Sequence, residues 1–184
     1  MRHLTLIPWG CAIGGIAPGA AVLAVKFKGS LLPSNSKIWV YQADRQLSNS
    51  EIKLIKKETE LFLNNWTSHN NEIESSYEIR YNSFLIIGLN EDINSTSGCS
   101  IDKSINFIKS FQSSLGVNFL NRLNVACKFK NDIKIITLPM FESMIRDEKL
   151  LKDSIVFNNM INTKELYENN WETTIEKSWH KKFL

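Results

Sequence analysis

The sequence has few of the residues that build metal sites, disulfide frameworks and catalytic clusters. Its 184 residues include three cysteines, Cys11, Cys99 and Cys127, and three histidines. No C-x-x-C, H-x-x-x-H or H-x-H pair occurs, so neither a structural zinc site nor a thiol redox motif is expected. Cysteines this few and this scattered predict reduced thiols and a cytoplasmic protein. We predict no metal and no cofactor.

The first thirty residues contain no Asp or Glu, and their only Lys and Arg residues are Arg2, Lys26 and Lys28. The rest of the chain, residues 31–184, holds the other 19 basic residues and all 19 acidic ones. This part is therefore neutral overall. A neutral body without a basic stripe argues against nucleic acid as a partner.

Residues 4–25 contain no charged side chain, which is the composition of a secretory signal or a membrane anchor. Two prolines and four glycines inside this run argue against a stable transmembrane helix. A third interpretation is an artificial or disordered extension. We therefore predict an apolar extension over residues 1–30 and one domain over residues 31–184, with a membrane as a partner only if the extension is a genuine anchor.

The remaining sequence alternates between strand and helix patterns, which predicts a single α+β domain. Strands are predicted at 37–42, 77–81, 84–89, 125–129 and 133–138. Helices are predicted at 48–66, 101–115, 139–150 and 163–182. The order strand, helix, hairpin, helix, strand matches the ferredoxin-like βαββαβ sheet, with C-terminal helices added.

The segment over residues 97–102 (SGCSID) ends a loop and opens a helix. Unpaired N–H groups and the positive end of the helix dipole lie in a first turn, and they lower a cysteine pKa or bind an anion. One hypothesis is a thiolate nucleophile at Cys99, with His69 as its base and Asp102 as a carboxylate in the same turn. The alternative is that Cys99 is a small capping residue and that Asp102 only complements the dipole.

A second hypothesis uses the same loop for binding. Gly98 and Ser100 would offer backbone N–H groups to an anion, and Arg80 would add a positive charge from the neighbouring strand. Asp44 and Arg45, after the first strand, would form the other rim of the site. The alternatives are a solvated strand face for Arg80 and a local ion pair for Asp44 and Arg45.

Four tryptophans, Trp39, Trp66, Trp171 and Trp179, are many for a domain of this size. A core aromatic cluster is one interpretation. The other is an exposed interaction surface on the C-terminal helix, since aromatic residues are enriched at interfaces.

Five peptides read together carry a family resemblance: KIWVYQADR (37–45), WTSH (66–69), YEIRYN (77–82), SGCSID (97–102) and SWHKKF (178–183). They resemble a family of short, uncharacterised bacterial proteins labelled "ABC transporter ATPase". The resemblance covers about residues 31–184. It implies a small cytoplasmic protein and no established activity.

The label conflicts with the residues. An ABC ATPase needs G-x-x-x-x-G-K-[ST], because a glycine-rich loop and a lysine must wrap the phosphates. The chain has no such run and no L-S-G-G-Q signature, and the pair Lys103-Ser104 falls inside a predicted helix. A P-loop nucleotidase is thereby excluded. The sequence favours an α+β protein with a binding or regulatory role toward a protein partner or a small anionic ligand; the alternative is a thiol-dependent enzyme using Cys99.

Overall fold

A computed structural model describes residues 32–184 except 69–70, 73, 91–97 and 131. It confirms a mixed α+β fold, with four α-helices and two larger antiparallel sheets in the described part of the chain. The predicted extension over residues 1–30 lies outside the described residues. Among the helices that are described, none has the length and apolar character needed to cross a membrane.

The first sheet contains β1 (Lys37–Gln42), β4 (Ser75–Arg80) and β5 (Phe84–Leu89) in the order β1-β5-β4, with both pairings antiparallel. The central strand β5 is buried along its whole length, as its continuous apolar run predicts. The predicted β4–β5 hairpin is confirmed. Its turn places Tyr81 at φ 53° and Asn82 at φ 51°, the two positive φ values that a tight hairpin turn requires.

Two helices, α1 (Asn49–Asn64) and α2 (Gly98–Leu115), pack on one face of this sheet. A capping box begins α1: the Ser48 side chain accepts from the backbone of Glu51, and the Glu51 side chain accepts from the backbone of Ser48. Helix α2 ends before Gly116, whose φ of 64° suits a residue without a Cβ. A small pair of strands, β2 (Thr67–Ser68) and β3 (Asn71–Glu72), follows α1.

The second sheet contains four strands in the order β7-β6-β8-β9. They are β6 (Asn124–Phe129), β7 (Asp132–Thr137), β8 (Ile155–Phe157) and β9 (Glu172–Thr174). Helix α3 (Leu138–Arg146) follows β7 directly and has a proline in its first turn, where the missing N–H breaks no helical bond.

This second sheet departs from the predicted ferredoxin-like arrangement. In that arrangement the strand after the second helix lies beside the first strand of the same sheet. Here β6, the strand after α2, pairs with β7 and β8 instead. The first sheet therefore keeps three strands, and β1 is an edge strand of it.

The single C-terminal helix predicted over 163–182 is wrong. The segment forms α4 (Lys164–Asn170), strand β9 and two short 3₁₀ helices, η1 (Ile175–Lys177) and η2 (Trp179–Phe183). The tertiary pairing of β9 with β8 overrides the helical spacing of the aromatic residues.

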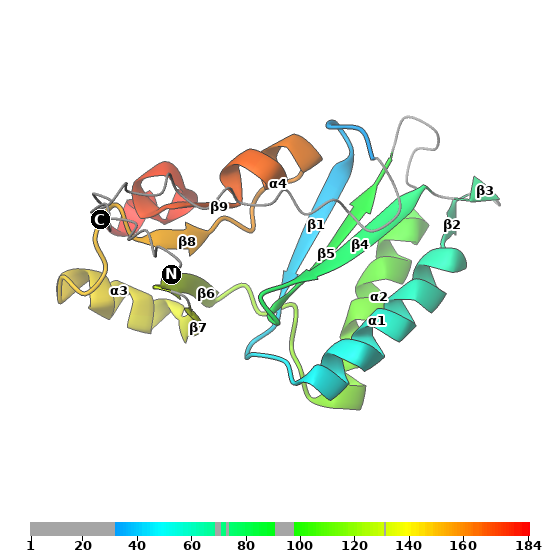
Figure 1. The fold of residues 1–184 in the computed structure, drawn as a ribbon, viewed down its shortest axis with the longest axis horizontal. Helices are drawn as coiled ribbons and strands as arrows, with labels where there is room; N and C mark the ends of the chain where they lie inside the picture. The colour runs from blue at the N-terminus through cyan, green and yellow to red at the C-terminus, as the bar shows by residue number, and fades with distance from the viewer. Residues whose placement is uncertain (1–31, 69–70, 73, 91–97, 131) are drawn as a thin grey trace, which may run out of the picture.

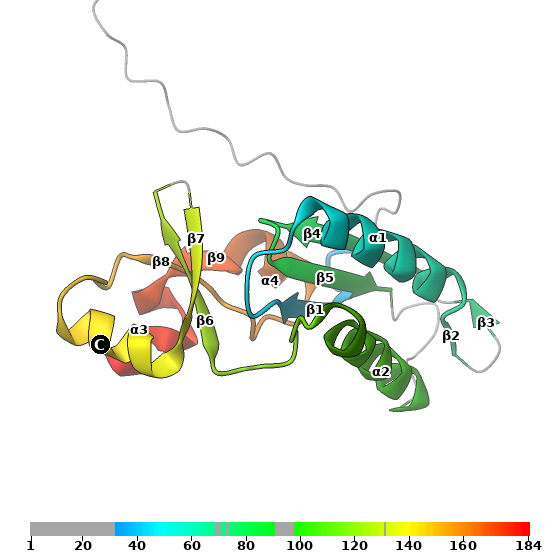
Figure 2. The same cartoon turned by 90° about the horizontal axis from the view of Figure 1, so that it is seen from below.

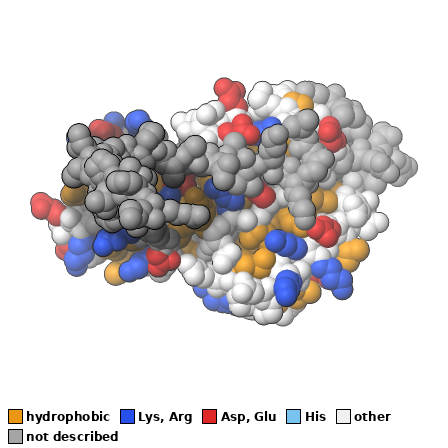
Figure 3. All heavy atoms as spheres, viewed as in Figure 1, with side chains coloured by type: hydrophobic (Ala, Val, Ile, Leu, Met, Phe, Trp, Pro, Cys, Tyr) orange, Lys and Arg blue, Asp and Glu red, His pale blue; other side chains and the backbone are white. Residues whose placement is uncertain are grey.

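The elements stack along the long axis of the molecule (Figures 1 and 2). Helices α1 and α2 cover one face of the first sheet, and α4 with the second sheet covers the other. The far side of the second sheet packs on α3 and the 3₁₀ helices. On the side seen in Figure 3, Lys and Arg side chains lie among hydrophobic and acidic ones over α1, which is typical of a solvated helix face.

Candidate functional site

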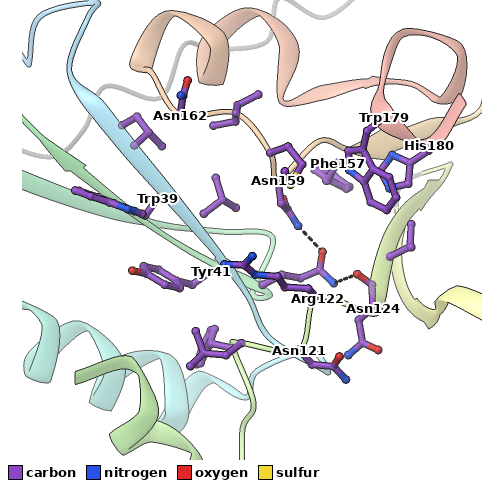
Figure 4. A pocket seen from close by; sticks show the side chains of 18 of the residues that line it. Trp39, Tyr41, Asn121, Arg122, Asn124, Phe157, Asn159, Asn162, Trp179 and His180 are labelled. Atoms are coloured by element: carbon purple, nitrogen blue, oxygen red, sulfur yellow. Dashed lines mark hydrogen bonds between the residues drawn. The ribbon is translucent and has the colours of Figure 1, made fainter. Parts of the chain in front are cut away.

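A pocket of about 310 Å³ lies along the outer edge of β1, between the two sheets (Figure 4). Four parts of the chain line it. They are β1, the stretch from Phe119 to the start of β6, the stretch from the end of β8 to Asn162, and the first residues of η2. The pocket therefore exists because β6 turns away from β1 after α2.

A chain of hydrogen bonds, called the amide relay here, links Trp171, Asn159, Gln42 and the backbone of Asn124 at the pocket. The Trp171 indole N–H donates to Asn159 Oδ1 at 3.0 Å, and Asn159 Nδ2 donates to Gln42 Oε1 at 2.8 Å. Gln42 Nε2 then donates to the carbonyl oxygen of Asn124 at 3.2 Å. Gln42 is only 6% exposed. The relay thus ties the edge of the first sheet to two segments of the second.

Aromatic side chains form much of the remaining wall. Trp39 is half-buried, and its ring centroid lies 6.2 Å from that of the buried Trp66. Trp179 is also half-buried and stacks on the imidazole of His180 at 3.9 Å between ring centroids. These faces offer apolar, flat surfaces to a ligand.

Two cationic side chains, Lys37 and Arg122, belong to the pocket lining, and the described lining residues include no Asp or Glu. Arg122 is exposed, and no ion pair joins it to a described residue. The ammonium of Lys37 lies 5.3 Å from the Trp39 ring centroid. The lining is therefore suited to a ligand that carries negative charge.

Asparagine side chains shape two of the lining segments. Asn118 Oδ1 accepts from the backbone N–H of Leu120 at 2.9 Å, and Asn158 Oδ1 accepts from that of Met160 at 3.3 Å. Such local bonds let asparagine fold the backbone into turns without a helix or a strand.

His180, the one histidine among the described lining residues, is held neutral. His180 is 1% exposed, and burial, followed by the charge of Lys182, lowers its pKa to about 4. Its Nδ1 lies 2.8 Å from the Ser178 hydroxyl. His180 therefore packs under Trp179 and adds no charge near neutral pH.

The predicted site around Cys99 is described only in its backbone. Helix α2 begins at Gly98, so Cys99 and Ser100 occupy its first turn. Asp102 is the fifth helical residue and lies one turn later than predicted. His69 lies outside the described residues, so its role as a base stays a prediction, as does the reactivity of Cys99.

Arg45 lies at the other end of α2. It makes a bidentate pair with Glu51, at 3.1 and 2.7 Å, and donates to the carbonyl of Leu115, the last residue of the helix, at 3.3 Å. Leu115 lies roughly 25 Å along the helix from Gly98, at 1.5 Å per residue. Arg45 and its neighbour Asp44 therefore do not form a rim around the Gly98 end.

Arg80 faces away from α2, on the side of the sheet that α4 covers. Its guanidinium lies 5.0 Å from the Tyr81 ring centroid, 5.7 Å from that of Trp171 and 3.9 Å from the Glu78 carboxylate. The Tyr167 hydroxyl donates to the same carboxylate, and burial raises the pKa of Glu78. Arg80 thus belongs to a packed cation–aromatic cluster on that side.

The tryptophans divide between core and pocket. Trp66 and Trp171 are 2% and 3% exposed, so the interpretation as core residues is confirmed for both. Trp39 and Trp179 line the pocket. The alternative interpretation, an exposed aromatic surface on one long C-terminal helix, does not apply because that helix is not formed.

Sequence reasoning missed Gln42, Arg122, Asn124 and Asn159 as site residues. A usable signal was the recurrence of asparagine in residues 118–124 (NFLNRLN) and 158–162 (NNMIN). It marks turns, yet it does not show that the two turns meet. Among the described residues, no group of three or more His, Cys, Asp or Glu side chains is placed to hold a metal ion.

Comparisons with known protein families, with curated proteins and with solved structures give no match to this chain. The family resemblance stated from the five peptides therefore stays a prediction.

Proposed function

We propose that this protein is a binding protein that holds an anionic ligand with an apolar body in the pocket beside β1. The observation that carries the proposal is the composition of the lining: two cations, an amide relay and aromatic faces, with no carboxylate among the described lining residues. Aromatic faces supply affinity for the body of the ligand, and a few fixed polar groups orient it.

A binding role fits this lining better than a hydrolytic one. Nucleophilic catalysis needs a nucleophile within hydrogen-bond reach of a base. The described lining offers neither Ser nor Cys, and its histidine is neutral and packed under Trp179. The scarcity of cysteine pairs favours a cytoplasmic setting for this binding protein.

The thiol-dependent enzyme remains the alternative. It is supported by the start of α2 at Gly98, which puts the backbone of Cys99 at the positive end of the helix. Arg80, which would hold an anion beside the Cys99 loop, instead packs against Tyr81 and Trp171, so the described residues offer this enzyme no arginine from that strand. The labelling experiment in the Discussion tests it.

The test of the proposed function uses the fluorescent anion 8-anilino-1-naphthalenesulfonate, which combines an aromatic body with a sulfonate. We expect saturable one-to-one binding that weakens about fivefold in Arg122→Gln, since an exposed ion pair contributes about 1 kcal/mol. The matched control is Arg146→Gln, which removes an exposed arginine at the end of α3. Equal binding by the two variants would overturn the proposal.

A further inference from the structure

The edge strand β1 presents half of its backbone polar groups to the pocket. In an antiparallel pair, successive residues turn their N–H and C=O groups to alternate sides. Ala43 N–H donates to Ser83 of the β5 side at 2.8 Å, whereas Ile38 N–H donates outward to Asn162 at 3.0 Å. By this alternation, the N–H and C=O groups of Val40 and Gln42 also point outward.

Among the described residues, the edge of β1 that faces away from β5 is covered at its beginning. Lys37 forms an isolated antiparallel bridge with Thr163, in which Lys164 N–H donates to Ser36 at 2.9 Å. Farther along β1, Val40 and Gln42 belong to the lining of the pocket. No described residue makes a hydrogen bond to the outward backbone groups of these two residues.

The fold explains why this edge is open. The order β1-β5-β4 with α1 and α2 on one face is the ferredoxin-like arrangement without its last strand. That last strand would lie beside β1, in the position of the pocket. Because β6 joins the second sheet instead, the backbone of β1 keeps the capacity to pair with one more strand.

We infer that the ligand of this pocket is an extended peptide segment of a partner protein, which adds to the outer edge of β1 and pairs with Val40 and Gln42. Strand addition of this kind takes its affinity from main-chain hydrogen bonds and its specificity from side-chain pockets. Trp39 and Trp179 contact the apolar side chains of the peptide. An acidic side chain or a terminal carboxylate beside Gln42 pairs with Arg122. The inference rests on the proposed function and names its ligand class.

The test uses the ¹⁵N-labelled full chain and a hexapeptide, acetyl-Thr-Val-Thr-Val-Thr-Asp with a free carboxylate. We expect its addition to shift the amide resonances of Val40 and Gln42. Val40→Pro removes an outward N–H without breaking a bond to β5, and proline is tolerated at such edge positions. Val40→Ala keeps the N–H and shortens the side chain. We expect about tenfold weaker binding in Val40→Pro and at most about twofold in Val40→Ala.

A second form of the peptide, N-methylated at alternate residues, tests the main-chain bonds without altering the protein. We expect it not to bind. Equal binding of both peptides, or of Val40→Pro and Val40→Ala, would overturn the inference, as would the absence of any shift at millimolar peptide. Binding of the naphthalenesulfonate without binding of the peptide would remove the inference and leave the proposed function standing.

Two other occupants of the edge would show in the same spectra. Slow amide exchange at Val40 and Gln42 that becomes fast when residues 1–30 are deleted would assign the edge to the chain's own N-terminal segment. Slow exchange that appears only at high protein concentration would assign it to a second copy. Either result overturns the inference of a partner peptide.

Discussion

Replacement of Gln42 by leucine should destabilise the protein although leucine fills nearly the same volume. Gln42 is 6% exposed and makes two hydrogen bonds, one to Asn159 Nδ2 and one to the Asn124 carbonyl. Leucine leaves both partners without their bond. Each buried polar group left unpaired costs about 1–3 kcal/mol, and water entering from the adjacent pocket places this case at the lower end. We expect a loss of about 2 kcal/mol.

The same substitution at Gln46 is the matched control. Gln46 is exposed and also makes two hydrogen bonds, to Asp132 at 3.2 Å and to the Ile133 carbonyl at 3.3 Å. Because water replaces bonds at an exposed site, we expect Gln46→Leu to change stability by less than about 0.5 kcal/mol.

Urea unfolding followed by circular dichroism measures both free energies. For a domain of this size, about 2 kcal/mol corresponds to a fall in Tm of roughly 4–8 °C. Asn159→Leu closes a double-mutant cycle with Gln42→Leu, and the relay predicts a coupling of at least about 0.5 kcal/mol. Equal losses in Gln42→Leu and Gln46→Leu would refute the reasoning, because the relay would then not hold the two sheets together.

Three further outcomes are expected. The stability that neutral His180 contributes is complete above pH 6.5 and is lost as the pH falls from 6.5 toward 4, because the unfolded chain takes up the proton first. Over this window the free energy of unfolding of the wild type should fall by up to about 3 kcal/mol relative to that of His180→Phe. Parallel pH profiles of the two proteins would contradict the buried neutral imidazole. Iodoacetamide should leave Cys127 unlabelled, since burial raises the pKa of its thiol to about 12. It should label Cys99 with a pH profile that His69→Ala does not change. A depressed pKa of Cys99 that rises in His69→Ala would instead establish the thiol enzyme. Deletion of residues 1–30 should lower Tm by less than about 5 °C in calorimetry, and a larger fall would show that they pack into the fold.

The elements predicted correctly are those whose local signals agree with their tertiary contacts. Helix α1 combines a capping box at Ser48 with apolar residues at helical spacing, and Ile55 is fully buried as that spacing requires. Strand β5 is a continuous apolar run and lies in the centre of its sheet. In such segments the sequence determines the structure locally.

The C-terminal segment shows where local reasoning fails. Tyr167 and Trp171 have helical spacing, and α4 does form up to Asn170. Glu172 then joins strand β9, where it pairs with Lys128 and accepts a hydrogen bond from Tyr81 at 2.6 Å. These contacts join residues far apart in the chain, so spacing alone could not predict them.

The pocket was unpredictable for the same reason. Gln42 lies 82 residues from Asn124 and 117 residues from Asn159, and each is an ordinary polar residue in its local sequence. The sequence did indicate the order β1, α1, β4, β5 and α2, although it missed the short strands β2 and β3. In the second sheet, β6 pairs along its whole length with β7 and at Cys127 with Val156 of β8, and the contact with β8 joins segments far apart in the chain.

Amide hydrogen exchange in β1 of the free protein tests the central claim most directly. The account predicts slow exchange at Trp39 and Tyr41, whose N–H groups point toward β5, and fast exchange at Val40 and Gln42, whose N–H groups point into the pocket. Slow exchange at all four amides would contradict it, because the edge of β1 would then already be paired and closed to a ligand.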